Sequence, residues 1–326
     1  MVKIKELVGR GLSTSNRLIV KEAYKRGVEF EILPKKRFRM KHGDKKYLVR
    51  LGHVSATPNT RLSRKLTKYK NATNSILRAS GFNAPENTTF KASEVERAWN
   101  WAKDILPVVV KPNDGIMGKL VFVKIDNYNE FVSCFNQVSE KYDEVLIEQF
   151  IEGEEYRFSF VKDKVVAVAK RVPANVVGDG INNVEQLIKL KNEERAKRKN
   201  PLHKKLDTEE ETQRVLKKQN LSLNYVPKER EIVYLRNNSN VSTGGDAIDV
   251  TNEINRAIKE TIGKAVKSIP GLKVCGVDVL IDGDNYTIIE INSHAMLSMH
   301  TYPWEGKSID IASKVVDLMF PNTINK

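Results

Sequence analysis

Three oxygen-bearing side chains in the C-terminal part of the chain have the types and the spacing of a metal site. Glu290 interrupts an apolar segment and Asn292 follows two positions later, so both share one face of a predicted strand. Asp278 lies inside a second apolar segment, residues 275–282. Turn-forming residues join the two segments, and a three-residue loop at 283–285 predicts that Asp278 lies opposite Glu290, with Cβ atoms about 5 Å apart.

Two carboxylates that face each other repel, and a divalent cation between them removes the repulsion. Two carboxylates and an amide oxygen suit Mg²⁺, which usually also binds water and substrate phosphates. The alternative is that these polar residues end their strands and face solvent, because Glu-x-Asn alone is a weak pattern. We predict a metal site at Asp278, Glu290 and Asn292, and the hypothesis then requires a nucleotide site in the same chain.

Residues 107–118 offer a candidate phosphate site. Lys111 closes the apolar segment Pro-Val-Val-Val-Lys-Pro, and a buried lysine is costly unless it meets an anion. Gly115 and Gly118 follow in a flexible loop whose backbone N–H groups can approach phosphate. The loop is not of the Walker type, so this signal is weak when taken alone.

Two further segments could contact a nucleotide or another anion. The segment 148–157 places acids after a predicted strand, where Glu155 could accept hydrogen bonds from a ribose; a surface cluster of acids is the alternative. In the segment 236–245, Arg236 ends an apolar strand, Asn240 offers hydrogen bonds, and the pair Gly244–Gly245 allows close backbone approach. The latter set is typical of an anion site.

Composition limits the classes of protein to consider. The 326 residues are 40% hydrophobic and 29% charged, as in globular proteins with more than one subdomain. The sequence contains no apolar stretch of about 18 residues and no signal-peptide pattern, so we expect neither a membrane partner nor export. Cys134 and Cys275 lie far apart, outside metal-type spacings, and a reducing cytoplasm fits them best.

The net charge of +14 is compatible with nucleic acid, with phosphate or with an acidic metabolite as partner. The densest basic segments, 34–46 and 194–205, do not interleave aromatic residues as single-strand binders do. We therefore do not expect a nucleic-acid partner.

The elements that must position these residues alternate between helix and strand. Helical patterns occur at 16–26, 70–80, 92–106, 127–142, 182–220, 251–269 and 308–320. Strand patterns occur at 28–33, 46–52, 107–112, 119–125, 144–151 and 231–236, with a hairpin at 154–174 around residues 162–164.

Together, these segments resemble the ATP-grasp superfamily. Within it they are most similar to the ligase half of bifunctional glutathione synthetases, and cyanophycin synthetases share most of the motifs. The resemblance extends from about residue 12 to residue 321. Its motifs are VVVKP (108–112) with the following glycines, EQFIEGEEYRF (148–158), KRVPANVVGDGINNVEQLI (170–188), EIVYLRNNSNVSTGGDAIDVT (231–251), CGVDVLI (275–281) and EIN with MHTYPWEGK (290–307).

The resemblance implies an α+β ATP-grasp fold in which ATP lies between two α+β subdomains. We expect an N-terminal α/β pre-ATP-grasp domain at 1–66, a small ATP-grasp lid subdomain at 67–147, and a C-terminal subdomain with the Mg²⁺ site at 148–326. The cofactors implied are ATP and Mg²⁺, with Mn²⁺ as an alternative metal.

The resemblance also implies a role for each matched position. Arg236, Arg171 and Asn240 are the expected catalytic residues, with Arg236 and Asn240 stabilising the transferred phosphate and Arg171 contacting the acylphosphate or a substrate carboxylate. Asp278, Glu290 and Asn292 are the expected metal ligands. The expected nucleotide contacts are Lys70, Lys111, Gly115 and Gly118 on the phosphates, Glu148, Gln149, Phe150 and Ile151 along the adenine, and Glu155 on the ribose.

The reaction implied is ATP-dependent ligation of a carboxylate to an amine through an acylphosphate, with release of ADP and phosphate. The substrates expected are small molecules, with a γ-glutamyl dipeptide and a small amino acid as the best candidates, and the enzyme is expected to form a homodimer. A cyanophycin-like ligase is the alternative, disfavoured because no Mur-ligase-like segment follows. A nucleotide-binding regulator without turnover is a second alternative, against which the intact metal set argues.

Three positions depart from the family pattern. We expect that no glutamate–cysteine ligase half precedes residue 1. Asn74 stands where relatives have a second lysine, and the segment after Glu290 reads Asn-Ser-His-Ala in place of an Asn-Pro step. His294 and His300 lie in this segment, and either a contact to a substrate carboxylate or a hydrogen bond within the fold would account for each.

Overall fold

The computed structural model describes residues 11–34, 37–50, 57–115 and 118–324, except for the side chain of Arg50. Its α-helices are α2 (Thr14–Lys25), α3 (Arg61–Leu66), α4 (Lys70–Ala79), α5 (Val95–Ala102), α6 (Tyr128–Ser139), α7 (Val184–Arg198), α8 (Glu210–Lys218), α9 (Arg256–Lys267), α10 (Ser298–Thr301) and α11 (Ile311–Met319). Its strands are β1 (Glu29–Leu33), β2 (Arg37–His42), β3 (Lys45–Arg50), β4 (Asn87–Phe90), β5 (Val108–Pro112), β6 (Phe122–Ile125), β7 (Val145–Gln149), β8 (Glu154–Val161), β9 (Lys164–Val172), β10 (Asn175–Val177), β11 (Ile232–Tyr234), β12 (Asp246–Asp249), β13 (Val274–Asp282) and β14 (Asn285–Asn292).

The chain divides into two compact units. The first contains the described residues up to Val168, together with Thr251–Ser298 and the residues from Asp310 on. The second contains Ala169–Val250 and Met299–Ile309. Strand β9 passes from the first unit into the second.

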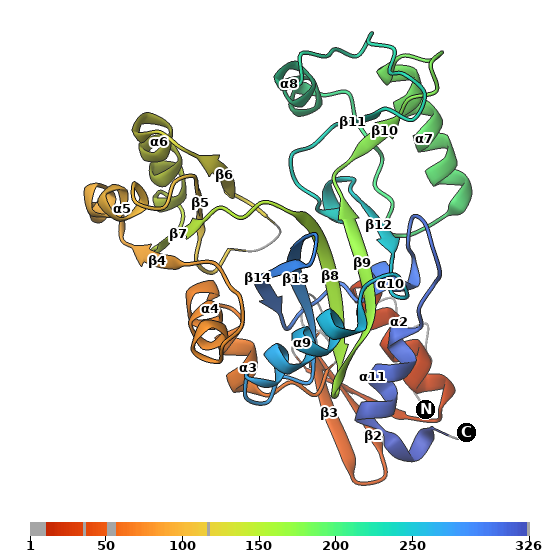
Figure 1. Ribbon diagram of the computed structural model, residues 1–326. Helices are drawn as coiled ribbons and strands as arrows, with labels where there is room; N and C mark the ends of the chain where they lie inside the picture. The colour runs from red at the N-terminus through yellow and green to blue at the C-terminus, as the bar shows by residue number, and fades with distance from the viewer. Residues whose placement is uncertain (1–10, 35–36, 51–56, 116–117, 325–326) are drawn as a thin grey trace. The chain divides into compact units, whose positions relative to one another are not determined.

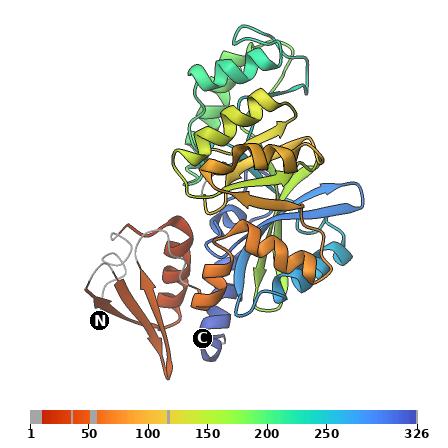
Figure 2. The same cartoon turned by 90° about the vertical axis from the view of Figure 1, so that its left-hand side faces the viewer.

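The N-terminal part of the first unit is a small α/β layer. Strands β1, β2 and β3 form an antiparallel sheet, and α2 packs against α11 from the other end of the chain (Figures 1 and 2). Ser13 caps the start of α2, and Gly27 ends it with a φ of 76° that other residues rarely adopt. Strand β2 has a strongly basic sequence and was not predicted, because alternating charges on its solvent face hide the buried Phe38 and Met40.

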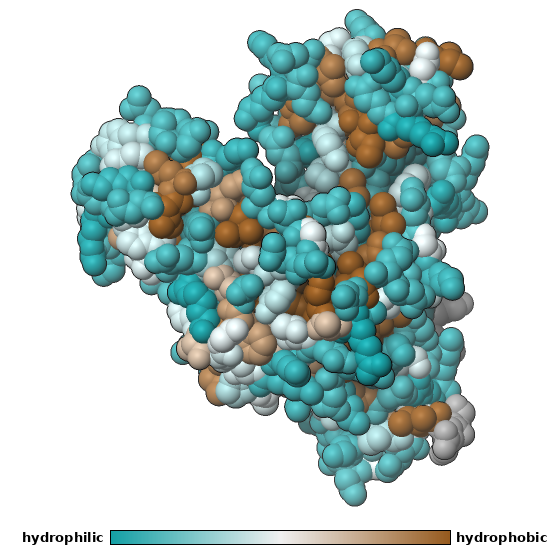
Figure 3. Space-filling view, in the orientation of Figure 1, coloured by the Kyte–Doolittle hydropathy of each residue, from teal (hydrophilic) through white to brown (hydrophobic). Residues whose placement is uncertain are grey.

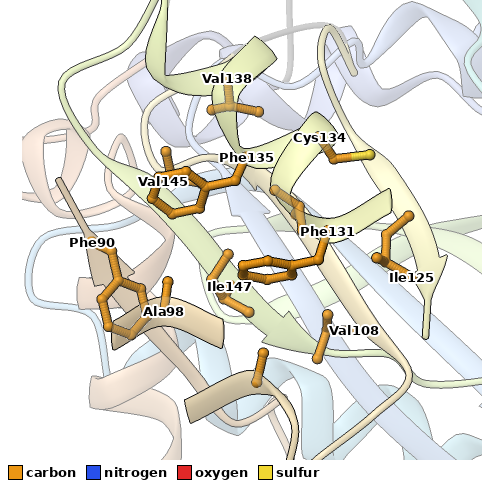
Figure 4. Close-up of a cluster of buried hydrophobic side chains, with 12 residues drawn as sticks. Phe90, Ala98, Val108, Ile125, Phe131, Cys134, Phe135, Val138, Val145 and Ile147 are labelled. Atoms are coloured by element: carbon orange, nitrogen blue, oxygen red, sulfur yellow. The ribbon is translucent and has the colours of Figure 1, made fainter. Parts of the chain in front are cut away.

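The next layer of the first unit surrounds a second core. Strands β4, β7, β5 and β6 form a four-stranded sheet, and helices α5 and α6 cover it (Figure 1). Figure 4 shows Phe131 and Phe135 of α6 among apolar side chains of the strands, with Phe90 and Ala98 beside them. All four are nearly inaccessible to solvent, so this core fixes β5 and β7, whose polar ends form part of the candidate site.

A five-stranded sheet in the order β12-β9-β8-β13-β14 contains the predicted metal residues. The expected three-residue loop between β13 and β14 is wrong: Asp282 pairs with Asn285, and Gly283 takes the positive φ of 57° of a tight two-residue turn. A bulge then displaces Ile289, and Asp278 still pairs with Glu290. The bulge places Ile288 and Ile291 opposite Val279 and Val277 in the apolar layer, while Glu290 and Asn292 lie on the other face.

The second unit is built on the short pair β10–β11 with helices α7 and α8. Asn183 begins α7 with a reciprocal capping box to Gln186, which satisfies two backbone N–H groups at the start of this charged helix. The visible face of the molecule is mostly hydrophilic, with apolar residues in separate patches (Figure 3). No helix among the described residues is long and apolar enough to cross a bilayer.

The helix predicted at 251–269 begins later, at Arg256, because the side chain of Asn255 caps its first turn. The helical segment predicted at 182–220 is interrupted: α7 ends at Arg198, α8 begins at Glu210, and the residues between them are not helical. The remaining predicted helices and strands that fall on described residues are present within a few residues of their expected limits. The end of the strand predicted at 46–52 lies outside the described residues.

Both thiols should react slowly in the folded protein. Burial raises the pKa of Cys134 to about 11, and burial also raises the pKa of Cys275. At pH 8 only about one thousandth of Cys134 is then thiolate, the form that attacks disulfide reagents. We expect 5,5′-dithiobis(2-nitrobenzoate) to release close to two equivalents of thionitrobenzoate in urea and far more slowly without it. Rapid release from the native protein would contradict the burial of these residues.

Candidate active site

The β13–β14 hairpin brings the three predicted metal residues to one face of the sheet in the first unit. Asp278 pairs with Glu290, and Asn292 lies opposite Gly276 one step along the strand. The Asn292 side chain donates from Nδ2 to Oδ2 of Asp278 over 3.3 Å. The two carboxylates and the amide are therefore neighbours, as the sequence predicted.

Asp278 is neutralised by an arginine that the sequence analysis did not select. Arg157 lies directly across from Asp278 on β8, and its Nη2 donates to Oδ2 over 2.9 Å while Nε donates to Oδ1. Both side chains are less than 10% exposed. Burial lowers the pKa of Arg157, but the Asp278 carboxylate outweighs this effect and the net pKa is raised. The segment around Arg157 contains several charged residues. Only the pairing of β13 with both β8 and β14 shows that Arg157 is the one that meets Asp278.

Glu290 also has a cation of the protein beside it. Lys70 Nζ lies 3.2 Å from Oε1 of Glu290 and donates to the carbonyl oxygen of Gly115 over 2.8 Å. The argument that repulsion between Asp278 and Glu290 requires a metal is therefore wrong, since Arg157 and Lys70 supply two positive charges. The types of ligand still support a metal site, because two carboxylates and one amide oxygen suit a hard divalent cation.

Among the described residues, no three histidine, cysteine, aspartate or glutamate side chains cluster as a metal site. A metal at Asp278 and Glu290 would thus take Asn292 as its third protein ligand and complete its shell with water or phosphate oxygens. The three oxygen donors fit this role. The thiol of Cys275 on β13 is buried.

A second polar group lies at the ends of β5 and β7. Lys111 Nζ is 2.6 Å from Oε1 of Glu148, and Asn74 Nδ2 donates to Oε2 of the same carboxylate over 3.2 Å. All three are less than 10% exposed. The anion that Lys111 was expected to meet is thus a residue of the protein, and Asn74, at the position of the family lysine, contacts the same carboxylate.

Helix α4 links the two polar groups. Lys70 and Asn74 are one turn apart on its surface, so one helix face reaches both Glu290 and Glu148. The buried side chain of Asn113 fixes the start of this helix, because its Oδ1 accepts from the Asn71 N–H and its Nδ2 donates to Glu144. The role of Asn113 depends on contacts with residues far away in the chain, so the sequence alone does not single it out.

The loop after β5 contains the two predicted glycines. A Cβ atom at Gly115 would lie 2.9 Å from a side-chain atom of Pro112, so a larger residue would displace the loop. Gly118 has a φ of 68°, which favours glycine. Residues 116–117 lie outside the described residues.

The residues predicted along adenine and ribose extend from the end of β7 to the start of β8. The N–H of Gln149 donates to Glu86 and that of Phe150 to Pro107, so these backbone donors are already used within the fold. Ile151 and Glu155 are both half-buried. Glu155 lies opposite Leu280 on β13 and close enough to Arg157 to raise its pKa.

The second unit holds the three predicted catalytic residues. Arg236 follows β11 and donates from Nη2 to Oδ2 of Asp207 over 2.5 Å, and from Nη1 to the hydroxyl of Thr212. Burial raises the pKa of Asp207, but the hydrogen bonds from Arg236 and Thr212 outweigh it and the net pKa is lowered. These contacts line a small hollow formed by Ala174, Leu206, Asp207, Leu235, Arg236 and Thr243.

Asn240 shapes the loop after Arg236. Its Oδ1 accepts from the Ser242 N–H, and its carbonyl oxygen accepts from Gly245. A Cβ atom at Gly245 would lie within 3.0 Å of three carbonyl oxygens of the protein, so the backbone is closely packed at this position. Arg171 on β9 lies opposite Ala247 and is half-buried.

A buried aspartate stabilises the loop that follows Arg236. Asp246 follows Gly245 directly and accepts from Lys191 and Arg195 of α7, each over 2.7 Å. Arg195 also donates to the Gly244 carbonyl oxygen, so α7 and the glycine pair are tied together. The basic segment 194–205 thus has a partly structural role. The guanidinium of Arg198 lies 4.1 Å from the ring centre of Trp304.

The two histidines of the segment after Glu290 differ in environment. His294 Nδ1 lies 3.2 Å from the Ser293 hydroxyl in the first unit. His300 is fully buried in the second unit, and its carbonyl oxygen accepts from Ile309. A role in the fold therefore accounts for His300.

Comparison with known families gives one domain match. Residues 67–296 match the family model described as the ATP-grasp domain. This range includes every predicted site residue in both units.

Comparison with curated proteins gives relatives of greater length. The chain is 35% identical over 332 residues to the glutathione biosynthesis bifunctional protein GshAB of Listeria innocua, and 31% identical over 328 residues to that of Pasteurella multocida. These alignments cover 97% and 95% of this chain but only 42% and 43% of the relatives. The chain thus spans less than half the length of the curated relatives it matches.

Solved structures show the same likeness. A crystal structure of a bifunctional glutathione synthetase from Pasteurella multocida superimposes with a TM-score of 0.69 at 30% identity, covering 96% of this chain and 45% of that one. A D-alanine–D-alanine ligase from Bacillus anthracis, 20% identical, superimposes with a TM-score of 0.53 over 82% of this chain and 71% of its own. The latter supports the fold alone.

The Lys111–Glu148 pair leads to a test of the site's electrostatics. Lys111→Met should lower the free energy of unfolding by about 3–5 kcal/mol, because it leaves the Glu148 carboxylate buried without a cation. Lys111→Met combined with Glu148→Gln should recover most of that loss. Urea unfolding followed by circular dichroism measures both. If the double variant is as unstable as the sum of the single variants, the two side chains do not form the buried pair described here.

Proposed function

We propose, since this chain belongs to the ATP-grasp family, that it is an ATP-dependent ligase that joins a small carboxylate to an amine. The family and the α+β ATP-grasp fold predicted from the sequence are confirmed. The enzyme class predicted, a carboxylate–amine ligase, agrees with the glutathione-forming relatives. Enzymes of this family use ATP and divalent metal ions.

The proposed reaction has two steps. An oxygen of the substrate carboxylate attacks the γ-phosphorus of ATP, and the bond to the β–γ bridging oxygen breaks to release ADP. The amine nitrogen then attacks the carbonyl carbon of the acylphosphate, phosphate leaves, and the nitrogen loses a proton. Positioning and charge neutralisation are what the protein must contribute to such steps.

The observation that supports this proposal most is the placement of Asp278, Glu290 and Asn292 on one sheet face with Lys70 beside them. Chance rarely brings two carboxylates, an amide and a lysine to one edge at the positions that the family resemblance selects. We propose Mg²⁺, with Mn²⁺ as the alternative, as the ion held by these three ligands. When bound, the ion would reduce the negative charge between ATP and the reacting carboxylate.

The remaining roles are assigned as the sequence resemblance implies. Lys70, Lys111 and the loop of Gly115 and Gly118 would contact the phosphates, and Glu148, which is paired with Lys111, would lie along the adenine. Hydrogen bonds to Asp207 and Thr212 orient the Arg236 side chain, and its remaining N–H groups would donate to the transferred phosphate. The other proposed contacts are Arg171 and Asn240 with the acylphosphate, Gln149, Phe150 and Ile151 with adenine, and Glu155 with ribose.

The substrate class is inferred from the relatives and from charge. The matched relatives are glutathione biosynthesis proteins, so we propose a γ-glutamyl dipeptide and a small amino acid as substrates. The division into segments 1–66, 67–147 and 148–326 and the assembly of a homodimer stay predictions.

The reaction class is tested by measuring ADP release with a panel of dipeptides and amino acids in the presence of Mg²⁺. We expect turnover with at least one acid–amine pair and a loss of at least about a hundredfold in Glu290→Gln, because a metal ligand is removed. Lys68→Gln, which removes a surface ion pair with Asp114, should retain most of the activity. ADP release that is independent of the amine and of Glu290 would contradict ligation at this site.

The charge of the chain predicts which acid is preferred. A net charge of +14 raises the local concentration of anionic substrates. We therefore expect γ-glutamylcysteine with glycine to be used more efficiently than neutral dipeptides with glycine, by a ratio of kcat/KM that falls as salt is added. Equal or better turnover of the neutral dipeptides would show that the charge argument fails, even where ligation itself is observed.

A further inference from the structure

Lys70 occupies an unusual position for a residue assigned to nucleotide phosphates. Its Nζ lies between Oε1 of Glu290, at 3.2 Å, and the carbonyl oxygen of Gly115, at 2.8 Å. Its side chain is only 10% exposed. One ammonium group therefore connects Glu290 on β14 with the glycine loop after β5.

The two cations beside the metal carboxylates are not equivalent. Arg157 and Asp278 form a bidentate pair with side chains 9% and 5% exposed, which is a fixed part of the sheet. Lys70 makes one contact to Glu290, whose side chain is 28% exposed. An ammonium at the end of a flexible stem can exchange its partner, whereas a buried bidentate guanidinium cannot do so without leaving a buried charge unpaired.

We propose, resting on the proposed function, that Lys70 is an internal counter-ion of Glu290 that competes with the metal ion for this carboxylate. Nucleotide phosphates relieve the competition by attracting Lys70 away from Glu290. Metal and nucleotide then favour each other's binding through this one side chain, in addition to any direct contact between them.

Lys68 provides a matched control on the same segment of chain. It lies two residues from Lys70 and pairs with Asp114 over 2.8 Å, with side chains 54% and 33% exposed. Its removal changes the net charge by the same unit and leaves the Lys70–Glu290 contact intact. An effect of Lys70→Gln that Lys68→Gln does not share is therefore due to the contact and not to the general charge.

The experiment measures Mn²⁺ binding to the whole chain by electron paramagnetic resonance of the free ion, without nucleotide. We expect Lys70→Gln to bind Mn²⁺ about fivefold more tightly than the unmodified protein, in line with the strength of a partly exposed ion pair. Lys68→Gln should change the affinity by less than about twofold. The factor by which Mn²⁺ tightens the binding of a fluorescent ATP analogue should also be smaller in Lys70→Gln.

The outcomes separate this inference from the proposed function. If Lys70 only contacts phosphate, Lys70→Gln will bind Mn²⁺ without nucleotide no more tightly than the unmodified protein, and the inference is overturned. The inference is also overturned if neither Lys70→Gln nor the unmodified protein binds Mn²⁺. Glu290→Gln tests the metal site itself, with circular dichroism of the variant as the control for folding. Mn²⁺ binding that survives Glu290→Gln would instead contradict the metal site on which the proposed function depends.

Discussion

The cost of burying a carboxylate inside a sheet is the constraint on which the candidate site depends. Asp278 is almost inaccessible to solvent and lies between β8 and β14, so its charge must be balanced from a neighbouring strand. Arg157 supplies that balance from directly across the strand pair. The same requirement appears at Glu148, which Lys111 and Asn74 satisfy. The polar part of the first unit is thus a set of compensated charges before any ligand enters.

This compensation decides which residues are fixed and which can respond to a ligand. Pairs with both members buried, such as Arg157 with Asp278, hold the register of the sheet. Lys70 and Arg236 are attached to carboxylates that solvent reaches in part, with exposed fractions of 28% for Glu290 and 35% for Asp207. Because partly exposed ion pairs contribute little free energy, an incoming anion can replace the carboxylate partners of Lys70 and Arg236 at a small cost in free energy.

The sequence predicted the ATP-grasp fold and the facing pair of Asp278 and Glu290, but not the contacts within the candidate site. Asp278 and Glu290 were predicted to face each other from periodicity, and they do so although the predicted loop length was wrong by one residue. The bulge at Ile289 corrected the error, and no local pattern marks it. Arg157 and Asn113 were not selected, because their partners lie more than 25 residues away in the chain and only the sheet register brings them together. Lys111 was correctly predicted to need an anion, whereas the identity of that anion depended on the pairing of β5 with β7.

The bulge has a consequence for how the hairpin tolerates change. It separates the tip of the hairpin, where Asn285 is exposed, from the part of β14 that holds Glu290 and Asn292. If the turn is one residue longer or shorter, forming or removing such a bulge can restore the pairing, since Ile288 and Ile291 then stay opposite Val279 and Val277. The length of the turn and the chemistry of the sheet edge are therefore free to vary independently, and a tag or a spectroscopic label at the tip would leave Glu290 and Asn292 in register.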